Sequence, residues 1–281
     1  MTGESRPHVR MHTALADELH QARQTRRADV VAPSVRGGTF DLDAAYAVER
    51  ELSRRRQAEG RTVVGRKVGY ANKAVWRALK LDTLVWADMY DDTVRHAPGN
   101  EATLSIAPLV APKIEPEIVF RLRAGLPPGT TDPAEVLAAV EWIALGFEII
   151  DCVYQDWTFQ PTDFVACYGL HAALIVGAPV AVDAASAPAL AQALAAFKVQ
   201  LLRNGEPAEQ GGGRNSLRSP ALCVAELATA ISRRAGAEPL VAGDLISSGT
   251  LTESRLIAPG DAWSATVDGL ELPDLTLRVE S

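Results

Sequence analysis

The chain has 281 residues, of which 47% are hydrophobic and 22% are charged, and its formal net charge is −7. This size and composition suit a globular protein with a large buried core, in one large domain or two small ones. The negative charge argues against nucleic-acid binding, and no stretch approaches the roughly 18 apolar residues that a membrane-spanning helix needs. Three cysteines without metal-type spacing favour a reducing compartment. We therefore expect a cytoplasmic protein that binds small molecules or copies of itself, with no nucleic acid or membrane partner.

The N-terminal part of the chain predicts helices. Residues 12–28 are rich in Ala, Leu, Glu, Gln and Arg, and a second helix follows Asp41, whose side chain can cap it, and stops at Gly60. At residues 62–70 the pattern changes to an apolar strand that contains glycines. This change marks a boundary between a helical segment and a sheet-forming region.

Helix and strand patterns alternate through the rest of the chain. One helix begins at Pro133 and is expected to carry Val136, Leu137, Val140 and Ile143 on one apolar face. The other expected elements are a short helix capped by Asn72, strands at 144–153 and 171–177, a helix at 185–197, a strand at 197–203 with a hairpin turn at Asn204-Gly205, a helix near 221–234, and short strands from Leu245 onward. Short strands alternating with turns favour a rolled, mixed sheet over a doubly wound arrangement.

Three glutamates form the most informative pattern. Glu115 and Glu117 lie two residues apart in a strand-like run, so their side chains point to the same face. Glu148 lies in an apolar run, where an unpaired carboxylate is costly to bury. A divalent cation would remove both the repulsion and the burial cost. An all-oxygen ligand set with room for water favours Mg²⁺ or Mn²⁺ over Zn²⁺.

The pair of glutamates also has a simpler interpretation. An E-x-E sequence on an exposed strand face is commonly solvated, and Lys113 and Arg121 could balance its charge. Spacing alone leaves both interpretations open.

A series of different short motifs lies between about residue 13 and the end of the chain. They are DAAYAV at 43–48, VGRKVG at 64–69, NKAV at 72–75, ADM at 87–89, PKIEPEI at 112–118, VEWI at 140–143, EIID at 148–151, DW at 156–157, NGE at 204–206, GDLI at 243–246 and SGTLT at 248–252. In this order they resemble the 2-keto-4-pentenoate hydratase and 4-oxalocrotonate decarboxylase group of the fumarylacetoacetate hydrolase superfamily.

The resemblance implies a fold and an organisation. The fold would be α+β, a fumarylacetoacetate hydrolase-type mixed β-roll with surrounding helices. A helical N-terminal segment would cover residues 1–60, and a metal-binding catalytic β-roll domain would cover residues 61–281. Members of this group assemble as homo-oligomers, and some hydratases associate with a partner enzyme of the same pathway, so both are expected here.

The resemblance also implies an activity in the catabolism of aromatic compounds. The expected enzyme is a hydro-lyase that uses Mg²⁺ or Mn²⁺ and a metal-stabilised enolate to add water to a 2-hydroxy-2,4-dienoate (2-oxo-4-enoate), giving a 4-hydroxy-2-oxo acid. The alternative is a decarboxylase of 2-oxohex-3-enedioate-type (4-oxalocrotonate) substrates on the same metal platform. Hydrolysis of an acylpyruvate would call for a His and Glu pair to activate water, and the histidines offer little support for one. A protein that keeps the fold without activity is a further alternative.

Site residues follow from the same resemblance. It places the metal on the three glutamates, in agreement with the charge pattern. Lys67 would face the substrate and transfer a proton, and Asp88 would have a supporting polar or proton-transfer role. Ser248 and Thr250 would hydrogen-bond the substrate carboxylate, although they could equally form a polar turn. Lys67 could be a surface lysine, but its flanking glycines indicate a closely approached strand.

One segment departs from the family's pattern. Hydratases of this group carry a stretch like DxxADNASSG where residues 163–172 of this chain read DFVACYGLHA. If the stretch lines the distal end of the substrate pocket, Tyr168 and His171 must supply its polarity, and both are predicted to bind substrate. In a later loop, Arg214 and Arg218 could hold a second carboxylate or face solvent, and solvent is favoured.

Overall fold

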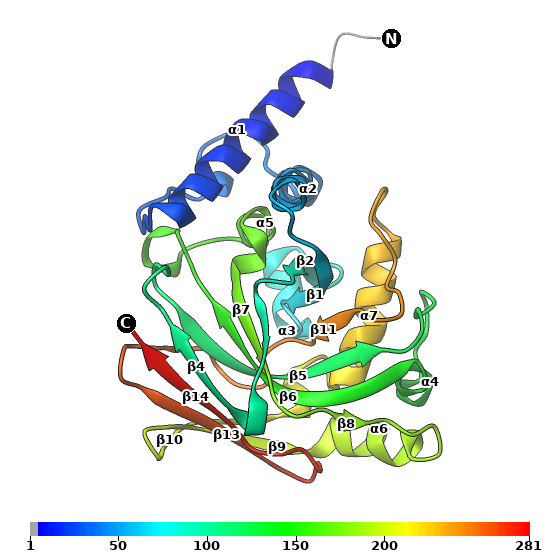
Figure 1. The fold of residues 1–281 in the computed structure, drawn as a ribbon. Coiled ribbons are helices and arrows are strands. Elements are labelled where there is room, and N and C mark those ends of the chain that lie inside the picture. The colour runs from blue at the N-terminus through cyan, green and yellow to red at the C-terminus, as the bar shows by residue number, and fades with distance from the viewer. Residues whose placement is uncertain (1–4) are drawn as a thin grey trace.

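The computed structural model describes residues 5–281, with side chains from residue 11 onward. Two curved sheets pack into a roll, with α1 and α2 above them and α4, α6 and α7 gathered at one side (Figure 1). The helices are α1 (Ser5–Gln24), α2 (Leu42–Ala58), α3 (Lys73–Leu79), α4 (Pro133–Ala138), α5 (Pro161–Ala166), α6 (Ala187–Ala196) and α7 (Pro220–Ser232). The strands are β1 (Val63–Gly69), β2 (Val85–Tyr90), β3 (Val94–His96), β4 (Glu101–Ser105), β5 (Lys113–Leu122), β6 (Val140–Ile150), β7 (His171–Val176), β8 (Val180–Ala181), β9 (Lys198–Arg203), β10 (Glu206–Gly212), β11 (Leu245–Ser247), β12 (Arg255–Leu256), β13 (Ala262–Asp268) and β14 (Leu275–Glu280).

Both sheets mix strand directions in part. The larger sheet has the order β2-β1-β11-β5-β6-β7-β3, with β12 beside β5 and β8 beside β6. In it β1 pairs with β11, and β3 with β7, in parallel, while the other pairs are antiparallel. The smaller sheet has the order β10-β9-β13-β14-β4, in which only the β14–β4 pair is parallel. The predicted α+β fold with a mixed β-roll is therefore confirmed.

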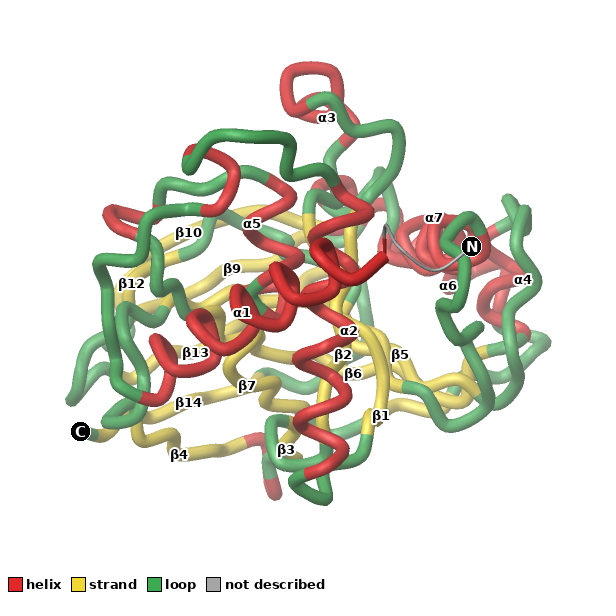
Figure 2. The backbone as a smooth tube through the Cα atoms, turned by 90° about the horizontal axis from the view of Figure 1, so that it is seen from above, coloured by secondary structure: helices red, strands yellow, loops and turns green. Residues whose placement is uncertain are grey.

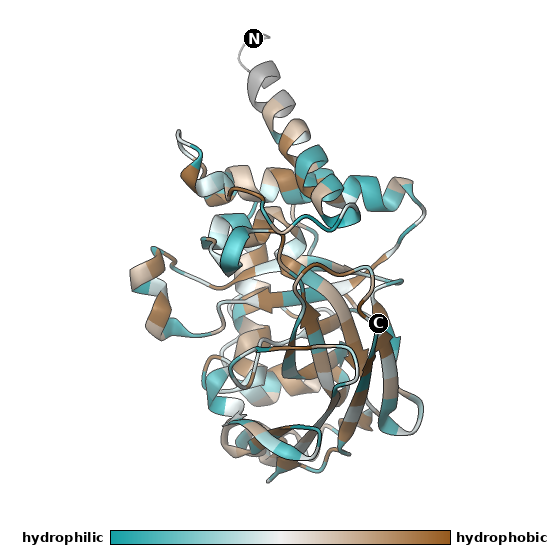
Figure 3. Cartoon of the chain, turned by 90° about the vertical axis from the view of Figure 1, so that its left-hand side faces the viewer, coloured by the Kyte–Doolittle hydropathy of each residue, from teal (hydrophilic) through white to brown (hydrophobic). Residues whose placement is uncertain are grey.

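Apolar side chains fill the space enclosed by the sheets and the helices. Hydrophobic residues run along the strands and also occur on the helices (Figure 3), and the largest buried side chains include Trp263, Phe120 and Phe147. A separate small cluster containing Met89 and Val119 covers the other face of the larger sheet. The central strands are thus buried on both faces, so a charged side chain on either face needs a partner.

Local signals in the sequence place most element ends correctly. Asp41 and Asn72 each accept a hydrogen bond at 2.9 Å from the backbone N–H of Ala44 and Ala74, as expected for helix caps. The Asn204-Gly205 turn joins β9 to β10 as the predicted hairpin. The described part of α1 begins earlier than predicted and ends at Gln24.

The predicted helix after Pro133 is too long. It ends at Ala138, and Val140 and Ile143 belong to β6, where Ile143 pairs with Phe120 of β5. Apolar residues at helical spacing also fit a strand that is buried on both faces, so strand pairing overrides the helical pattern here.

The N-terminal helices lie across the strands of the roll (Figure 2). Helix α2 packs against α5, and α1 packs against α2. The division into residues 1–60 and 61–281 stays a prediction. Among the described residues, no helix combines the length and the apolar character that crossing a membrane requires.

Candidate metal and substrate site

The pairing of β5 with β6 brings three carboxylates onto one face of the larger sheet. Glu115 lies directly opposite Glu148, and Glu117 lies opposite Gly146. One ligand oxygen from each glutamate lies within 4.8 Å of those of the other two. Two adjacent strands therefore build the cluster that the sequence predicted.

Burial excludes the interpretation of these glutamates as solvated surface residues. Glu117 and Glu148 have no exposed surface, and Glu115 is half-buried. The two basic residues nearby do not neutralise them: Lys113 Nζ lies 3.8 Å from the ring centre of Trp157, and Arg121 pairs with Glu141 at 3.0 Å. The cluster needs another source of positive charge.

The electrostatics of the cluster favour protons or a cation. Burial, followed by repulsion from Glu148, raises the pKa of Glu115 to about 7. The same two causes raise the pKa of Glu117 well above its ordinary value. Burial also acts to raise the pKa of Glu148, but Lys67 and His171 together outweigh it and lower that pKa. Without a cation, two of the three carboxylates therefore tend to hold protons, which a metal ion would displace.

The contacts of Glu117 fit a metal ligand. Its Oε2 accepts hydrogen bonds from the Ser247 hydroxyl and, at 2.9 Å, from the Gly249 N–H. Its Oε1 is buried and has no hydrogen-bond partner. Such an orphaned oxygen is costly in a closed site unless a cation binds it. Glu148 Oε2 likewise has no hydrogen-bond partner, and three carboxylates with two such orphaned oxygens suit a hard cation such as Mg²⁺ or Mn²⁺.

Sequence reasoning missed Ser247 as a supporting residue. The residue ends β11, which lies between β1 and β5, so its hydroxyl reaches Glu117 across the sheet. Only the order of the strands brings the two together. The alternation of residues within the LISS segment would have been a usable signal once that order was known.

Lys67 lies on β1 beside the carboxylates. Its side chain is almost fully buried, and its Nζ lies 3.2 Å from Glu148 Oε2 and donates to the Gly169 carbonyl at 2.8 Å. Phe164 covers it, with 4.5 Å between Nζ and the ring centre. A side chain at Gly69 would collide with that ring. The prediction of a closely approached strand around Lys67 is confirmed.

A cavity of about 680 Å³, which we call the Lys67 cavity, opens beside this site. Lys67 and Glu115 line its polar end, and Thr250 contributes to its wall. Four aromatic side chains also line it, namely Tyr70, Trp157, Phe159 and Phe164. The cavity thus combines charged and polar groups with aromatic surface, as small-molecule sites commonly do.

The structure does not bring Asp88 to this cavity. In the antiparallel pairing of β1 with β2, Asp88 lies opposite Arg66, while Lys67 lies opposite Ala87. Neighbouring residues of a strand face opposite sides, so Asp88 and Lys67 point away from each other. Asp88 instead pairs with Arg66 at 3.0 Å and accepts from Ser53 at 2.8 Å. Asp88 therefore does not line the Lys67 cavity, and its expected supporting or proton-transfer role stays a prediction.

The two predicted carboxylate-binding hydroxyls differ in position. Ser248 is fully buried and its hydroxyl donates to the Ile118 carbonyl at 2.7 Å, so it does not face the substrate space. Thr250 does line the Lys67 cavity, and its hydroxyl donates to the Thr252 carbonyl at 2.9 Å. The expected role of Ser248 is therefore corrected, and that of Thr250 stays a prediction.

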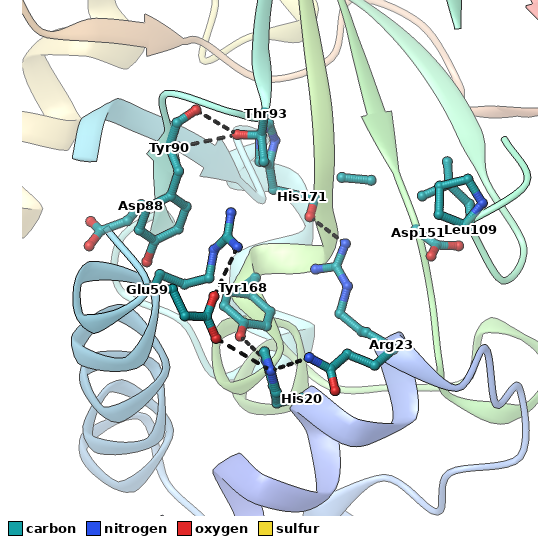
Figure 4. Close-up of a pocket in the computed structure, with 14 residues that line it drawn as sticks. His20, Arg23, Glu59, Asp88, Tyr90, Thr93, Leu109, Asp151, Tyr168 and His171 are labelled. Carbon is teal, nitrogen blue, oxygen red and sulfur yellow. Dashed lines mark hydrogen bonds and ion pairs between the residues drawn. The ribbon is translucent and has the colours of Figure 1, made fainter. Parts of the chain in front are cut away.

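Tyr168 and His171 also lie away from the Lys67 cavity. Both line a second cavity of about 270 Å³, with His20 and Arg23 of α1 (Figure 4). The chain turns sharply before β7, because Tyr168, Gly169 and Leu170 all have positive φ. As a result, Leu170 is the residue of this turn that lines the Lys67 cavity. The expectation that Tyr168 and His171 supply polarity at the distal end of the substrate is wrong.

The two arginines of the later loop are exposed. Arg214 and Arg218 border a separate small pocket and not the Lys67 cavity. Their predicted orientation toward solvent is confirmed.

A curled mixed sheet that gathers three carboxylates on one face defines a class of α+β protein that binds a divalent metal. The chain belongs to the fumarylacetoacetate hydrolase family: the family model described as "Fumarylacetoacetate (FAA) hydrolase C-terminal" matches residues 62–279. This match covers the strands that carry Lys67 and all three glutamates.

Individual relatives extend the similarity over most of the chain. It is 33% identical over 234 residues to a 2-hydroxyhexa-2,4-dienoate hydratase of Comamonas testosteroni, covering 82% of this chain and 83% of that protein. It is 31% identical over 262 residues to a 2-keto-4-pentenoate hydratase of Paraburkholderia xenovorans (strain LB400), covering 91% and 90%. A solved structure of 4-oxalocrotonate decarboxylase from Pseudomonas putida G7, complexed with magnesium and adipate, aligns with a TM-score of 0.85 at 26% identity, covering 96% and 97%.

Proposed function

We propose that the protein is a metal-dependent hydratase of the 2-keto-4-pentenoate hydratase kind. It adds water to a 2-hydroxy-2,4-dienoate, the enol form of a 2-oxo-4-enoate, and gives a 4-hydroxy-2-oxo acid. The observation that carries this proposal is a cluster of three carboxylates beside Lys67, of which Glu115 and Lys67 line one cavity. The names of the two hydratases reported above support the choice of reaction.

Glu115, Glu117 and Glu148 would hold Mg²⁺ or Mn²⁺. When bound, such a cation acts as a Lewis acid toward the oxygens of a 2-oxo acid. The magnesium in the related decarboxylase structure supports this assignment.

Side chains of this chain would do the remaining work. Hydration of a dienol requires a proton to move along the carbon chain before water adds. We assign this transfer to Lys67, because its Nζ is held by Glu148 and the Gly169 carbonyl at the end of the cavity. Trp157, Phe159 and Phe164 would pack on the carbon chain and exclude bulk water.

A decarboxylase acting on 2-oxohex-3-enedioate is the second candidate. That substrate has a carboxylate at its far end, and Lys113 adds a second cation to the lining of the Lys67 cavity. The related decarboxylase structure favours this candidate as well. The two reactions differ in one product, since only decarboxylation releases CO₂.

We also propose that the protein self-associates, binds a partner enzyme of its pathway and works in the cytoplasm. The three cysteines are free thiols, which suits a reducing compartment. Size-exclusion chromatography with light scattering tests the self-association, and a single-chain mass would contradict it.

A proton NMR time course tests the function. The purified protein is incubated with Mg²⁺ and freshly generated 2-hydroxypenta-2,4-dienoate, with EDTA as the control. We expect metal-dependent formation of 4-hydroxy-2-oxopentanoate. A parallel reaction with 2-oxohex-3-enedioate is monitored for CO₂; release there without hydration of the dienoate would assign the decarboxylase. No reaction in either would contradict both candidates.

A further inference from the structure

We propose that His171 is a positioning residue that fixes the orientation of Glu148 as a metal ligand. The inference rests on the proposed metal site and adds a residue that lies outside the Lys67 cavity. In this role His171 acts through Glu148 and does not touch the substrate.

The contacts of Glu148 carry the first step. His171 is 3% exposed, and its Nδ1 lies 2.9 Å from Glu148 Oε1. The other carboxylate oxygen, Oε2, lies 3.2 Å from Lys67 Nζ. Of the two oxygens of this fully buried carboxylate, Oε1 is hydrogen-bonded by His171 and Oε2 is ion-paired with Lys67 without a hydrogen bond, and the two partners lie on different strands. A carboxylate held at both oxygens cannot rotate freely about its last bond.

The hydrogen bonds of His171 define its proton arrangement. An ionised carboxylate only accepts hydrogen bonds, so Nδ1 carries the proton that faces Glu148. Nε2 lies 3.0 Å from the Thr93 hydroxyl, whose own proton is donated to the Tyr90 carbonyl at 2.9 Å. The Thr93 oxygen in turn accepts the Tyr90 N–H at 3.1 Å. One chain of hydrogen bonds thus connects the β2–β3 turn to the metal cluster through the imidazole.

The backbone explains why His171 reaches Glu148. The β6–β7 pairing shifts its register between Ile149 and Ile150, and Ile150 then pairs with His171. Such an irregularity re-aims the side chain that follows it. Arg23 of α1 donates to the His171 carbonyl at 2.7 Å, and His20 hydrogen-bonds the Tyr168 hydroxyl at 2.9 Å (Figure 4). Through Arg23, the N-terminal helix therefore holds the backbone of His171 itself.

Geometry argues against His171 as the base that activates water. It lines the second cavity and does not line the Lys67 cavity. Both ring nitrogens already have partners, at Glu148 and Thr93. Supporting contacts of this kind usually tune ligand affinity and orientation.

The test compares Mn²⁺ affinities, measured by EPR of free Mn²⁺ in solutions of the full-length protein. His171→Leu removes the donor and is expected to weaken Mn²⁺ binding about 10–100-fold. His171→Asn places an amide N–H near the position of Nδ1 and is expected to bind Mn²⁺ nearly as tightly as the wild type. Tyr168→Phe is the matched control, because it alters the same cavity and segment without touching Glu148, and its affinity should not change.

Unfolding by urea in EDTA separates ligand positioning from general stability. Should His171→Leu fail to fold, His171→Gln replaces it. The glutamine amide lies one bond farther from the backbone than the asparagine amide and so misses the position of Nδ1. His171→Gln should therefore lose Mn²⁺ affinity, whereas His171→Asn should not. Wild-type affinity in His171→Leu or His171→Gln, or an equal loss in His171→Asn, would overturn the inference. A wild-type protein that binds no Mn²⁺ would overturn the metal site itself, and with it the proposed function.

Discussion

Lys67 and Glu148 form a buried ion pair at the charged end of the Lys67 cavity. A buried pair is stable only when further hydrogen bonds satisfy both partners, and here the Gly169 carbonyl and His171 supply them. This pairing keeps a proton-carrying amine beside the carboxylates. It also means that removing one partner affects the other.

Lys67→Met tests the assigned proton transfer. We expect turnover to fall about 10²–10⁴-fold, as is typical when a general acid or base is removed. Mn²⁺ affinity should change much less than turnover, because the loss of the Lys67 contact with Glu148 is offset by the loss of a positive charge beside the ligands. Steady-state kinetics and Mn²⁺ titration measure the two effects separately. Lys113→Met is the matched control, and an equal loss of turnover in both variants would contradict the assignment.

Glu49 of α2 predicts a pH dependence of stability. Burial, with a contribution from Asp88, raises the pKa of Glu49 to about 8 from an ordinary value of 4.5. Protonated Glu49 therefore stabilises the fold below the ordinary value, and this contribution is lost as the pH rises through the folded pKa. Glu49→Gln stays uncharged, so its free energy of unfolding relative to wild type should increase between pH 5 and pH 9.

Urea unfolding at the two pH values measures this difference. Glu51→Gln, on the same helix, is the control: Arg54 lowers the pKa of Glu51 against a small effect of burial, so that carboxylate is ionised throughout this range. The prediction would be contradicted if the difference in free energy of unfolding between Glu49→Gln and the wild type changed with pH no more than that of Glu51→Gln.

Strand β1 depends on a close contact with α5. A Cβ at Gly69 would overlap the ring of Phe164, which itself covers Lys67. Gly69→Ala should therefore cost about 1–3 kcal/mol of stability through overpacking. The cost should be smaller in a Phe164→Ala background, where the overlap is gone. Urea unfolding of the four proteins of this cycle measures the coupling, and strictly additive effects would rule out the contact.

Alternation along one strand could be predicted from the sequence, whereas pairing between strands could not. Glu115 and Glu117 share a face because neighbouring positions alternate, and this needs no knowledge of β6. The sequence alone could not tell on which side of the sheet Asp88 lies, because its face relative to Lys67 depends on the β1–β2 register. A shift of one residue in that register moves every side chain to the other face.

The conformation of the segment before β7 could not be predicted from the sequence for a related reason. Tyr168 and Leu170 adopt positive φ although neither is glycine, which local sequence preferences do not anticipate. The irregular pairing at Ile150 then directs His171 to Glu148. Tertiary packing sets both features, so the sequence indicated the polar residues but not the cavity that they line.

The whole roll assembles the site from segments that lie far apart in the chain. β1, β5, β6 and β11 contribute Lys67, the three glutamates and Ser247, and they meet only in the order of the larger sheet. The family resemblance predicted that Lys67 and the carboxylates form one site, and the structure places their side chains close together. The resemblance carried no information on Ser247 or on the role of α1 in holding the turn before His171.

Metal binding should therefore be a property of the complete fold. The apo protein holds buried carboxylates that repel one another, and a bound cation would remove that repulsion. Calorimetric titration of Mn²⁺ into the wild type and Glu117→Gln measures this. We predict one Mn²⁺ per chain in the wild type and a loss of affinity of at least about 10-fold in the variant, because Glu117 supplies one of the orphaned oxygens. Equal Mn²⁺ affinity and stoichiometry in the two proteins would contradict the carboxylate site.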